Sequence, residues 1–336
     1  MRTAVLIPCY NEAKTIKTVV EDFRSTLPDA DIYVYDNNST DGTDDIAREA
    51  GAIVRYEVRQ GKGNVIRTMF REIDADCYIM ADGDNTYPAS FAPKLQRLVL
   101  DGKADMVIGD RLSSSYFTEN KRRFHGFGNR LVRSLINHLF HAKINDIMTG
   151  ARAFSRDFVK SFAVSSKGFE IETEMTIFAL ENNFRIMEVP IEYKDRDADN
   201  PSKLSTYSDG YKVLKTIFRL LRDDKPTVFF GAIGIVTILI GVALFIPIVI
   251  EFSRTGEVPR YPTLIVLTAL WVIGIVSIFS GVILSLINAR SKQEFERFMN
   301  LMYICDGREI RGNVRKKGTR AWQKSTERGY WKGWDE

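Results

Sequence analysis

Two aspartates separated by one glycine, Asp82-Gly83-Asp84, are the residues of this chain whose type and spacing point most directly to chemistry. They follow the apolar run at residues 78–81, so a buried strand is expected to end in two carboxylates that can turn toward one point. Mg²⁺ and Mn²⁺ prefer such hard oxygen ligands together with phosphate oxygens and water. The turn therefore predicts a metal held against a diphosphate. By itself it could also be an ordinary surface turn, because Asp and Gly are common turn formers.

Polar segments also follow two earlier apolar runs, at residues 3–7 and 31–35. Asp36 comes directly after the second run, where its carboxylate could accept hydrogen bonds from a base or a ribose. Asp41 or Thr43, a little farther on, is expected only to cap the helix that follows. The candidate ligand-binding residues after these two runs are Pro8, Tyr10, Glu12, Asp36 and Asn38.

Strand and helix signals alternate through the first 200 residues, which predicts an α/β fold with a mostly parallel sheet. Ligands bind at the carboxyl edge of such a sheet. All three polar segments fall at that edge, so they describe one site. The expected strands are residues 3–7, 31–35, 53–56 and 77–81, and the expected helices are 13–25, 42–50 and 62–72.

Two further segments carry charge at positions that suit a sugar nucleotide. Residues 61–63, with Lys62 between two glycines, look like a short phosphate loop, but the full P-loop pattern is missing and an ATPase is not favoured. Glu170, Glu172 and Glu174 stand two residues apart before a helix. Glu172 is our choice for a carboxylate that points to the sugar, although acids are also favoured in the first turn of any helix.

Residues 226–250 and 261–289 carry no charge, and each segment is longer than the roughly 20 residues that cross a hydrocarbon core about 30 Å thick. We interpret both as transmembrane helices, because two such runs are unexpected in a soluble chain with 27% charged residues. Basic residues flank the pair, whereas the connection 251–260 carries both signs. The positive-inside rule then predicts a multi-pass protein of the cell (inner) membrane with both termini cytoplasmic.

The net charge of +4 comes without a basic stripe that would suit nucleic acid, so an anionic lipid bilayer is the expected partner. Residues 209–225 alternate basic and apolar positions like a helix that lies in the membrane interface, and the tail 290–336 is also basic. A homo-oligomer is expected, because the first span carries small residues that allow close helix packing, namely Gly231, Gly234 and Gly241.

Taken in order, the motifs match a known group of enzymes. They are Ile7 to Glu12, Asp36 to Thr43, Gly61-Lys62-Gly63, Asp82-Gly83-Asp84, Gly109-Asp110-Arg111, Asp146 to Arg152, Glu188 to Ile191 and Ser202-Lys203-Leu204. The chain resembles inverting family-2 glycosyltransferases, specifically dolichyl-phosphate mannose synthases and bacterial polyprenyl-phosphate glycosyltransferases. The resemblance covers residues 1–221. It implies a GT-A domain, a Rossmann-like nucleotide-diphospho-sugar transferase fold, at residues 1–208, followed by the two transmembrane helices.

The resemblance also implies roles for single residues. Asp82 and Asp84 would bind Mg²⁺ or Mn²⁺, and Thr86 stands where the family often has Gln or Ser. Arg111 would bind the phosphates. Arg111, Asp84 and Glu172 are the three residues predicted to be catalytic. The residues implied in binding the nucleotide-sugar are Pro8, Tyr10, Glu12, Asp36, Asn38, Lys62, Asp82, Arg196 and Lys203, the last two in a loop that closes over the diphosphate. Arg122 and Arg123 would contact the phosphate of the acceptor.

The function that the resemblance implies is sugar transfer from UDP-GlcNAc or UDP-Glc to undecaprenyl phosphate, with inversion, on the cytoplasmic face. The product would be a lipid-linked sugar donor for modifying cell-envelope glycans. One alternative is a polyprenyl-phosphate mannose synthase that uses GDP-mannose, and another is a membrane scaffold that binds nucleotide-sugar without turnover. A processive polysaccharide synthase is less favoured, because such enzymes usually carry a Gln-x-x-Arg-Trp sequence and more spans, and this chain has neither.

Overall fold

The computed structural model describes residues 1–113, 123–168, 170–193, 218, 222–223, 225–258 and 260–305. Most of the basic segment at 209–225 and the chain beyond residue 305 lie outside the described residues, so the predicted interface helix and most of the predicted tail have no structural description.

One sheet of seven strands organises the N-terminal part of the chain, in the order β3-β2-β1-β4-β6-β5-β7. The strands are β1 (Thr3–Cys9), β2 (Asp31–Asp36), β3 (Ile53–Tyr56), β4 (Cys77–Met80), β5 (Met106–Asp110), β6 (Arg152–Ser155) and β7 (Ile186–Pro190). Strands β1 to β4 pair in parallel, as do β5 and β7, whereas β6 runs antiparallel to both β4 and β5. The predicted α/β fold with a mostly parallel sheet is confirmed, and the reversed β6 is an addition to it.

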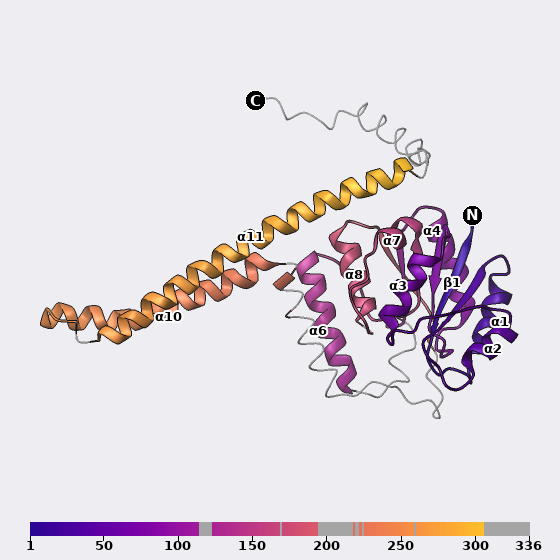
Figure 1. The fold of residues 1–336 in the computed structure, drawn as a ribbon, viewed down its shortest axis with the longest axis horizontal. Coiled ribbons are helices and arrows are strands. Elements are labelled where there is room, and N and C mark those ends of the chain that lie inside the picture. The colour runs from indigo at the N-terminus through magenta and orange to yellow at the C-terminus, as the bar shows by residue number, and fades with distance from the viewer. Residues whose placement is uncertain are drawn as a thin grey trace. The chain divides into compact units, whose positions relative to one another are not determined.

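Helices cover both faces of this sheet, so two apolar cores form (Figure 1). One core includes side chains of α1, α2 and α4, and the other includes side chains of α3, α6, α7 and α8. The helices are α1 (Ile16–Thr26), α2 (Thr43–Glu49), α3 (Lys62–Glu72), α4 (Ala92–Leu100, after a 3-10 turn at Ala89–Phe91), α6 (Arg123–Phe140), α7 (Arg156–Ser161) and α8 (Ile171–Glu181).

Covering both faces explains the sequence of the central strands. Residues Ala4 to Ile7 of β1 are fully buried, and this unbroken apolar run is typical of a parallel strand with helices on each side. In α1 the buried positions Ile16, Val19, Val20 and Phe23 follow the helical period. This helix begins three residues later than predicted. Thr15, just before it, donates from its hydroxyl to the carbonyl oxygen of Gly83 at 2.7 Å, so this segment supports the Asp82–Asp84 turn instead.

The register of the strands places the polar segments side by side. Cys9 at the end of β1 pairs with Asp36 at the end of β2, and Leu6 pairs with Met80 at the end of β4. Met80 also pairs with Arg152 at the start of the antiparallel β6. The ends of three parallel strands and the beginning of one antiparallel strand therefore meet at one edge, which we call the carboxyl edge.

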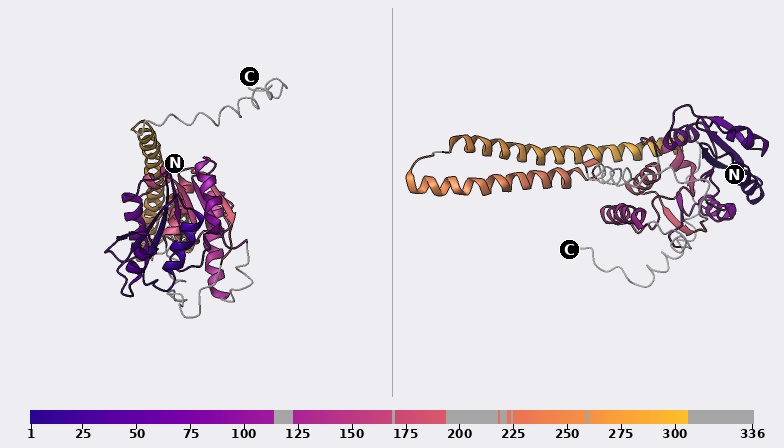
Figure 2. Two further views of the ribbon diagram at one scale, coloured as in Figure 1. Left: turned by 90° about the vertical axis from the view of Figure 1, so that its right-hand side faces the viewer. Right: turned by 90° about the horizontal axis from the view of Figure 1, so that it is seen from below.

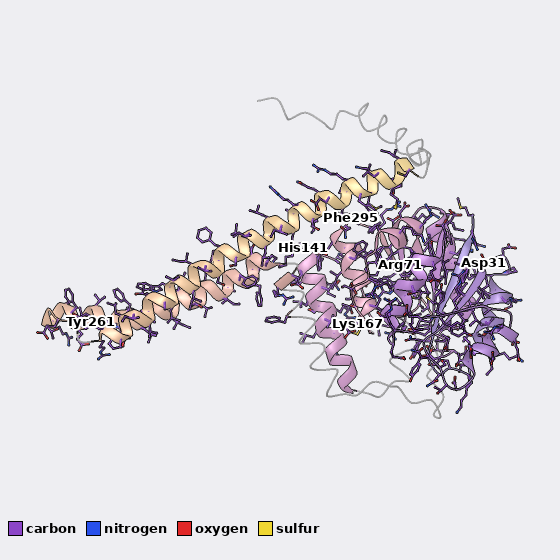
Figure 3. The ribbon with its side chains drawn as sticks, in the orientation of Figure 1. Asp31, Arg71, His141, Lys167, Tyr261 and Phe295 are labelled. Atoms are coloured by element: carbon purple, nitrogen blue, oxygen red, sulfur yellow. The ribbon has the colours of Figure 1, made fainter. Side chains whose placement is uncertain are left out.

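Two long apolar helices follow, α10 (Pro226–Thr255) and α11 (Tyr261–Cys305), and both are long and apolar enough to cross a membrane. They run side by side along their apolar parts (Figure 2). A Cβ added to Gly234 would lie 2.6 Å from the carbonyl oxygen of Gly274, so the absence of side chains lets the backbones approach there. Tyr261, labelled in Figure 3, begins α11 after the connection. Both helices extend past the uncharged segments predicted from sequence.

Candidate active site

Four predicted carboxylates gather around one buried thiol at the carboxyl edge. Burial raises the pKa of Cys9 well above its usual value, and four nearby negative charges raise it further, those of Glu12, Asp36, Asp82 and Asp84. A Cβ added to Gly83 would lie 2.7 Å from the Cys9 sulfur and 3.6 Å from Cγ of Glu12. The structure therefore brings together residues from three separate polar segments, as the sequence predicts.

One carboxylate oxygen of Asp36 is buried and accepts no hydrogen bond from the described residues. Its Oδ2 accepts a hydrogen bond from the Ser39 backbone at 3.0 Å, but its buried Oδ1 has no hydrogen-bond partner there. Leaving a buried acceptor unsatisfied is costly, so such an atom calls for a donor supplied by a ligand. A hydroxyl or ring N–H of a nucleoside would meet this need.

Asp84 is buried and is oriented by its neighbour Thr86. The hydroxyl of Thr86 donates to Oδ1 of Asp84 at 2.7 Å. Among the described residues, no group of three or more His, Cys, Asp and Glu side chains is placed to hold a metal ion. A divalent cation on Asp82 and Asp84 would complete its shell with diphosphate oxygens and water, which is the coordination that Mg²⁺ prefers. The donor set fits such an ion, with Thr86 supporting a ligand.

Lys62 joins two of the predicted carboxylates. Its buried Nζ lies 2.5 Å from Oδ1 of Asp82 and 2.6 Å from Oε1 of Glu172. Burial lowers the pKa of Lys62, but the charges of Asp82 and Glu172 outweigh burial and raise it above its usual value, so the amine is cationic. On the other side of Asp82, an added Cβ on Gly150 would overlap Oδ2. These contacts hold Asp82 in place and extend the site to the start of α8.

Two backbone N–H groups of the 61–63 segment form hydrogen bonds within the protein. The Gly61 backbone donates to Oδ1 of Asn37 at 2.7 Å, and the Gly63 backbone donates to the carbonyl oxygen of Lys167 at 3.1 Å. The amide group of Asn37 also donates to the carbonyl oxygen of Glu57 at 2.6 Å. These backbone groups are therefore used within the protein, and the segment serves to deliver Lys62. Sequence reasoning missed Asn37, whose only signal is an amide side chain directly after a predicted strand.

Arg111 is held by a fully buried aspartate. Its Nε and Nη2 donate to the two carboxylate oxygens of Asp146 at 2.8 and 3.1 Å, and its guanidinium carbon lies 5.6 Å from the centre of the Tyr193 ring. The hydroxyl of Tyr87 accepts from the Gly150 backbone at 3.2 Å and lies 3.5 Å from Nη1 of Arg111. Arg111 is thus connected, through Tyr87 and Gly150, to the surroundings of Asp82.

The other predicted site residues lie on β1, after β1 or β2, or outside the described part of the chain. Tyr10 is 40% exposed at the carboxyl edge, and Pro8 pairs with Tyr35 inside the sheet. Asn38 adopts a positive φ of 63°, and its amide donates to the carbonyl oxygen of Val58 at 2.8 Å, which is a structural contact. The residues that lie outside the described part of the chain are Arg122, the side chain of Arg123, Arg196 and Lys203.

Asp41 and Thr43, expected only to cap the helix that follows, also support the chain after β1. The N-cap position of α2 is Gly42, and the carboxylate of Asp41 just before it accepts from the backbone of Thr43, the first residue of the helix, at 3.2 Å. Asp41 also accepts from the Ala13 backbone at 3.0 Å, and the hydroxyl of Thr43 accepts from the Glu12 backbone at 2.9 Å. Both side chains thus hold the segment that carries Glu12, because the chain after β1 has backbone donors that no strand or helix satisfies.

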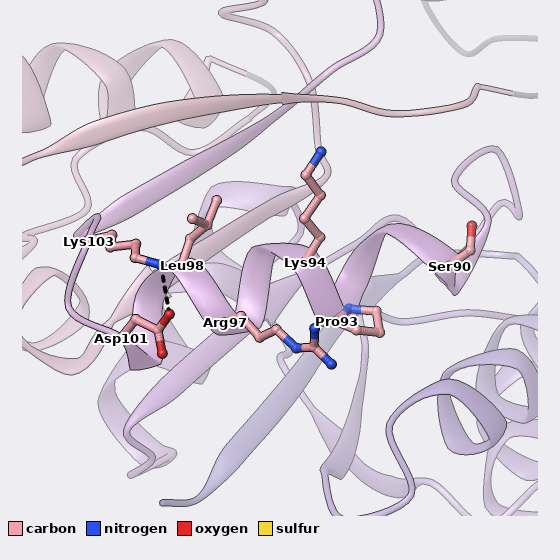
Figure 4. Close-up of a pocket in the computed structure, with 7 residues that line it drawn as sticks. All are labelled: Ser90, Pro93, Lys94, Arg97, Leu98, Asp101 and Lys103. Carbon is pink, nitrogen blue, oxygen red and sulfur yellow. Dashed lines mark hydrogen bonds and ion pairs between the residues drawn. The ribbon is translucent and has the colours of Figure 1, made fainter.

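A surface pocket on α4 contains none of the predicted residues (Figure 4). Three of its seven lining residues are basic, and one of these, Lys103, pairs with Asp101 at 3.0 Å. This pocket contributes nothing to the carboxyl edge. It is lined by Ser90, Pro93, Lys94, Arg97, Leu98, Asp101 and Lys103.

Comparison with known proteins agrees with this geometry. Residues 4–162 match the model of Glycosyl transferase family 2. The chain is 30% identical to Glycosyltransferase AglJ of Haloferax volcanii, over 88% of this chain and 97% of that protein. It is 28% identical to Undecaprenyl-phosphate mannosyltransferase of Micrococcus luteus, over 61% of this chain and 88% of the relative.

The fold is also known from a solved structure. Glucosyl-3-phosphoglycerate synthase of M. tuberculosis superposes with a TM-score of 0.53 at 22% identity, over 66% of this chain and 79% of that one. At this identity the likeness speaks to the fold, which is the GT-A type of mixed α/β sheet domain. Together with the family match and the similarity over nearly the full length of the Haloferax relative, it leads to one conclusion. The chain belongs to glycosyltransferase family 2.

Proposed function

We propose that this enzyme transfers a hexosyl residue from a nucleoside-diphosphate sugar to a polyprenyl phosphate, with inversion, on the cytoplasmic face of the membrane. The observation that carries the proposal is the gathering of Glu12, Asp36, Asp82 and Asp84 at one edge, with Lys62 and Arg111 beside it. The presence of two apolar helices in the same chain supports a lipid acceptor. The name of the Micrococcus relative, an undecaprenyl-phosphate mannosyltransferase, supports it further.

In this proposal the donor lies along the carboxyl edge. Asp36 accepts hydrogen bonds from the nucleoside, and Asp82 and Asp84 would hold Mg²⁺ or Mn²⁺ beside the diphosphate. When bound, the cation neutralises charge on the leaving diphosphate. Arg111 donates hydrogen bonds to the same phosphates, oriented by Asp146. Glu172 and Lys62 border the place of the sugar, where an ammonium and a carboxylate can bind its hydroxyl groups.

The acceptor phosphate needs little activation. A phosphate monoester has a second pKa near 6, so one of its oxygens is already anionic at neutral pH. The enzyme then has to align that oxygen with the anomeric carbon and stabilise the leaving nucleoside diphosphate. The new bond forms from the acceptor oxygen to the anomeric carbon as the bond to the diphosphate breaks, and a single displacement of this kind inverts the configuration. Arg122 and Arg123 are proposed as contacts for the acceptor phosphate, with Arg196 and Lys203 closing over the donor.

The donor is the least constrained part of the proposal. Our sequence-based prediction is UDP-GlcNAc or UDP-Glc, and GDP-mannose is the second candidate. The second candidate is favoured by the mannosyltransferase named among the relatives. Both fit the neutral, hydroxyl-rich sugar that the Lys62 and Glu172 pair could bind.

The orientation in the membrane and the oligomeric state are proposals of the same kind. The basic flanks of the apolar helices support cytoplasmic termini, which would leave residues 251–260 on the far side. A homo-oligomer is supported by small residues of the first span, of which Gly231 has open space around its Cβ position.

One experiment tests the proposed reaction. Purified enzyme in membranes or detergent is given Mn²⁺, undecaprenyl phosphate and, separately, UDP-Glc, UDP-GlcNAc and GDP-mannose, and the lipid product is weighed by mass spectrometry. One donor should yield a lipid heavier by one sugar residue. Tight binding of a donor with no lipid-linked product from any of the three would favour a scaffold without turnover and would contradict the proposal.

A further inference from the structure

Arg152, the first residue of β6, is the largest completely buried side chain among the residues that the structure describes. Its guanidinium binds only neutral groups within the described residues. Nε donates to the carbonyl oxygen of Thr149 at 3.0 Å, Nη2 to that of Ile147 at 2.6 Å, and Nη1 to the hydroxyl of Thr176 at 2.9 Å. Burying a charge without an ion pair is costly. The position therefore needs a reason other than packing.

The charge is kept despite the burial. Loss of water around the guanidinium lowers the pKa of Arg152 to about 10, and the negative charges of Glu172 and Asp146 act in the opposite direction. Arg152 is therefore cationic at neutral pH. Its charge lies near the two carboxylates that hold Lys62 and Arg111.

Two of its three oxygen partners belong to the segment that carries Asp146, which we call the 146–150 loop. Asp146 at one end of this loop binds Arg111 through both carboxylate oxygens. Gly150 at the other end lies so close to Asp82 that a Cβ would overlap it. By binding the carbonyl oxygens of Ile147 and Thr149, Arg152 fixes the middle of the loop, and so both of its ends.

The third partner belongs to α8. The hydroxyl of Thr176 accepts from Arg152 and donates to the carbonyl oxygen of Glu172, one helical turn earlier, at 2.9 Å. Glu172 in turn binds Lys62 at 2.6 Å. A single buried guanidinium thus contacts both the 146–150 loop, which sets Arg111, and the helix turn that carries Glu172.

We infer that Arg152 is a positioning residue for sugar transfer, which holds the 146–150 loop against α8 and so fixes Arg111 relative to the Lys62 and Glu172 pair. The inference rests on the proposed function, because Arg111 and Glu172 take their roles from it. Arg152 acts through these residues, since it is fully buried behind them. Small displacements at such positions are expensive, and about 1 Å can cost roughly a hundredfold in rate.

The test compares three variants of the full-length enzyme, assayed with undecaprenyl phosphate and the donor that the wild type uses. R152M removes the charge and R152K keeps it with fewer donors. K160M is the matched control, because Lys160 on α7 also binds two carbonyl oxygens, those of Phe70 and Ile73 at 2.9 and 2.6 Å, but does not touch the site. Rates are expressed per folded molecule, with the folded fraction taken from circular dichroism at the assay temperature.

For R152M we expect kcat to fall about a hundredfold while KM for the donor changes less than about threefold, because alignment is lost and ground-state binding is not. R152K should recover at least about tenfold of that loss, and K160M should keep kcat within about twofold. A purely structural role would lower the folded fraction in both R152M and K160M and leave kcat per folded molecule unchanged. Equal kcat in R152M and wild type, or no recovery in R152K, would overturn the inference.

T176V gives a second test that does not remove the buried charge, and it decides the question if R152M does not fold. This variant keeps the shape of Thr176 but deletes its bonds to Arg152 and to Glu172, so kcat should fall about fivefold to tenfold. A kcat within twofold of wild type would contradict the inference.

Failure of the proposed function would be visible separately, as a wild type that transfers no sugar to lipid. In that case the same variants are compared by the rise in unfolding temperature that UDP or GDP causes with Mn²⁺. The free nucleoside diphosphate carries one more negative charge than the donor, and Arg111 would meet that charge only on the leaving group. R152M should therefore weaken binding of the free diphosphate more than binding of the donor, and it should show less than half of the wild-type rise. Equal rises in R152M and wild type would overturn the positioning role.

Discussion

The carboxyl edge of the sheet and the α10–α11 helix pair differ in which kinds of side chain they bury and which they expose. At the edge the protein buries charged groups, including Asp84, Asp146 and Arg152. In the helix pair, residues 226–250 and 261–289 carry no charge, and large apolar side chains remain exposed, such as Leu239 at 60% and Ile265 at 72%.

This difference separates residues that serve the chemistry of the site from residues that suit the surroundings of the protein. Buried ion pairs are weak contributors to stability, because desolvation offsets most of their attraction. Their concentration at the carboxyl edge is therefore better explained by chemistry than by folding. Exposed apolar surface of the extent seen on the helices is unfavourable in water and neutral in lipid, so it reflects the surroundings of the protein. The following changes test each side of this contrast.

The largest effect is expected at Asp84. D84A should lower kcat with Mn²⁺ by about a thousandfold, because a ligand of the proposed cation and its contribution to the leaving group are both lost. Steady-state rates over a range of Mn²⁺ concentrations measure this, with D101N on the exposed end of α4 as the control. Full metal-dependent turnover by D84A would contradict the role given to this residue.

Lys62 should matter for stability as well as for activity. K62M leaves the buried Glu172 and the partly exposed Asp82 without their cation, which should cost about 3 kcal/mol of unfolding free energy. Unfolding of the full chain in detergent, followed by circular dichroism, checks this, and K94M at an exposed position of α4 should have no effect. Adding E172Q to K62M should restore part of the loss. If K62M were as stable as wild type, the loss of the cation would not leave a buried charge uncompensated, and the contacts described for Lys62 would be contradicted.

The helix pair offers a matched comparison of two glycines. A side chain at Gly234 would lie 2.5 Å from Cγ1 of Ile278 and 2.6 Å from the carbonyl oxygen of Gly274, whereas one at Gly231 meets nothing within 4 Å. G234L should therefore cost about 2 kcal/mol through overpacking, and G231L should leave the packing of the pair unchanged. Thermal unfolding in detergent measures both. Equal effects of the two changes would show that the helices do not pack as described.

The smallest effect concerns the Glu57–Arg59 charge pair, which follows the end of β3 next to Asp36. Hydrogen bonds from Arg59, together with that from Thr68, lower the pKa of Glu57 from 4.5 to about 2. Since the folded pKa lies below the unfolded one, Glu57 stabilises the protein above about pH 4.5, and this contribution is lost as the pH falls toward 2.

E57Q tests that charge pair through the acid dependence of unfolding. Arg59 is half exposed, so the change should cost only about 1 kcal/mol at pH 7. It should also reduce the loss of unfolding temperature between pH 5 and pH 3. An unaltered acid dependence in E57Q would mean that this carboxylate does not titrate as stated.

Much of the fold follows from local patterns in the sequence. The apolar runs before Asp36 and Asp82 predict buried strands, and the shared edge of a parallel sheet predicts that their carboxylates meet. The two long uncharged segments predict the long apolar helices. These features depend on residues that are near each other in the chain, or on a general rule for parallel sheets.

Other parts of the site depend on contacts that no local pattern reports. Lys62 and Glu172 meet only because α3 and α8 pack on the same face of the sheet. Arg152 has a charged side chain at a position that local patterns favour as exposed, and its burial follows from the antiparallel pairing of β6 between β4 and β5. The role of Asp146 as the partner of Arg111 has the same origin, since the two residues come from different loops.

The central claim is that the carboxyl edge holds a nucleoside diphosphate together with a divalent cation. Calorimetric titration of the purified full-length enzyme with UDP and with GDP, with and without Mn²⁺, tests it directly. One nucleotide should bind with Mn²⁺, and its binding should weaken at least a hundredfold when Mn²⁺ is removed or Asp84 is replaced by Ala. G231L should bind like wild type. Equal affinity with and without Mn²⁺, or unchanged affinity in D84A, would contradict the claim.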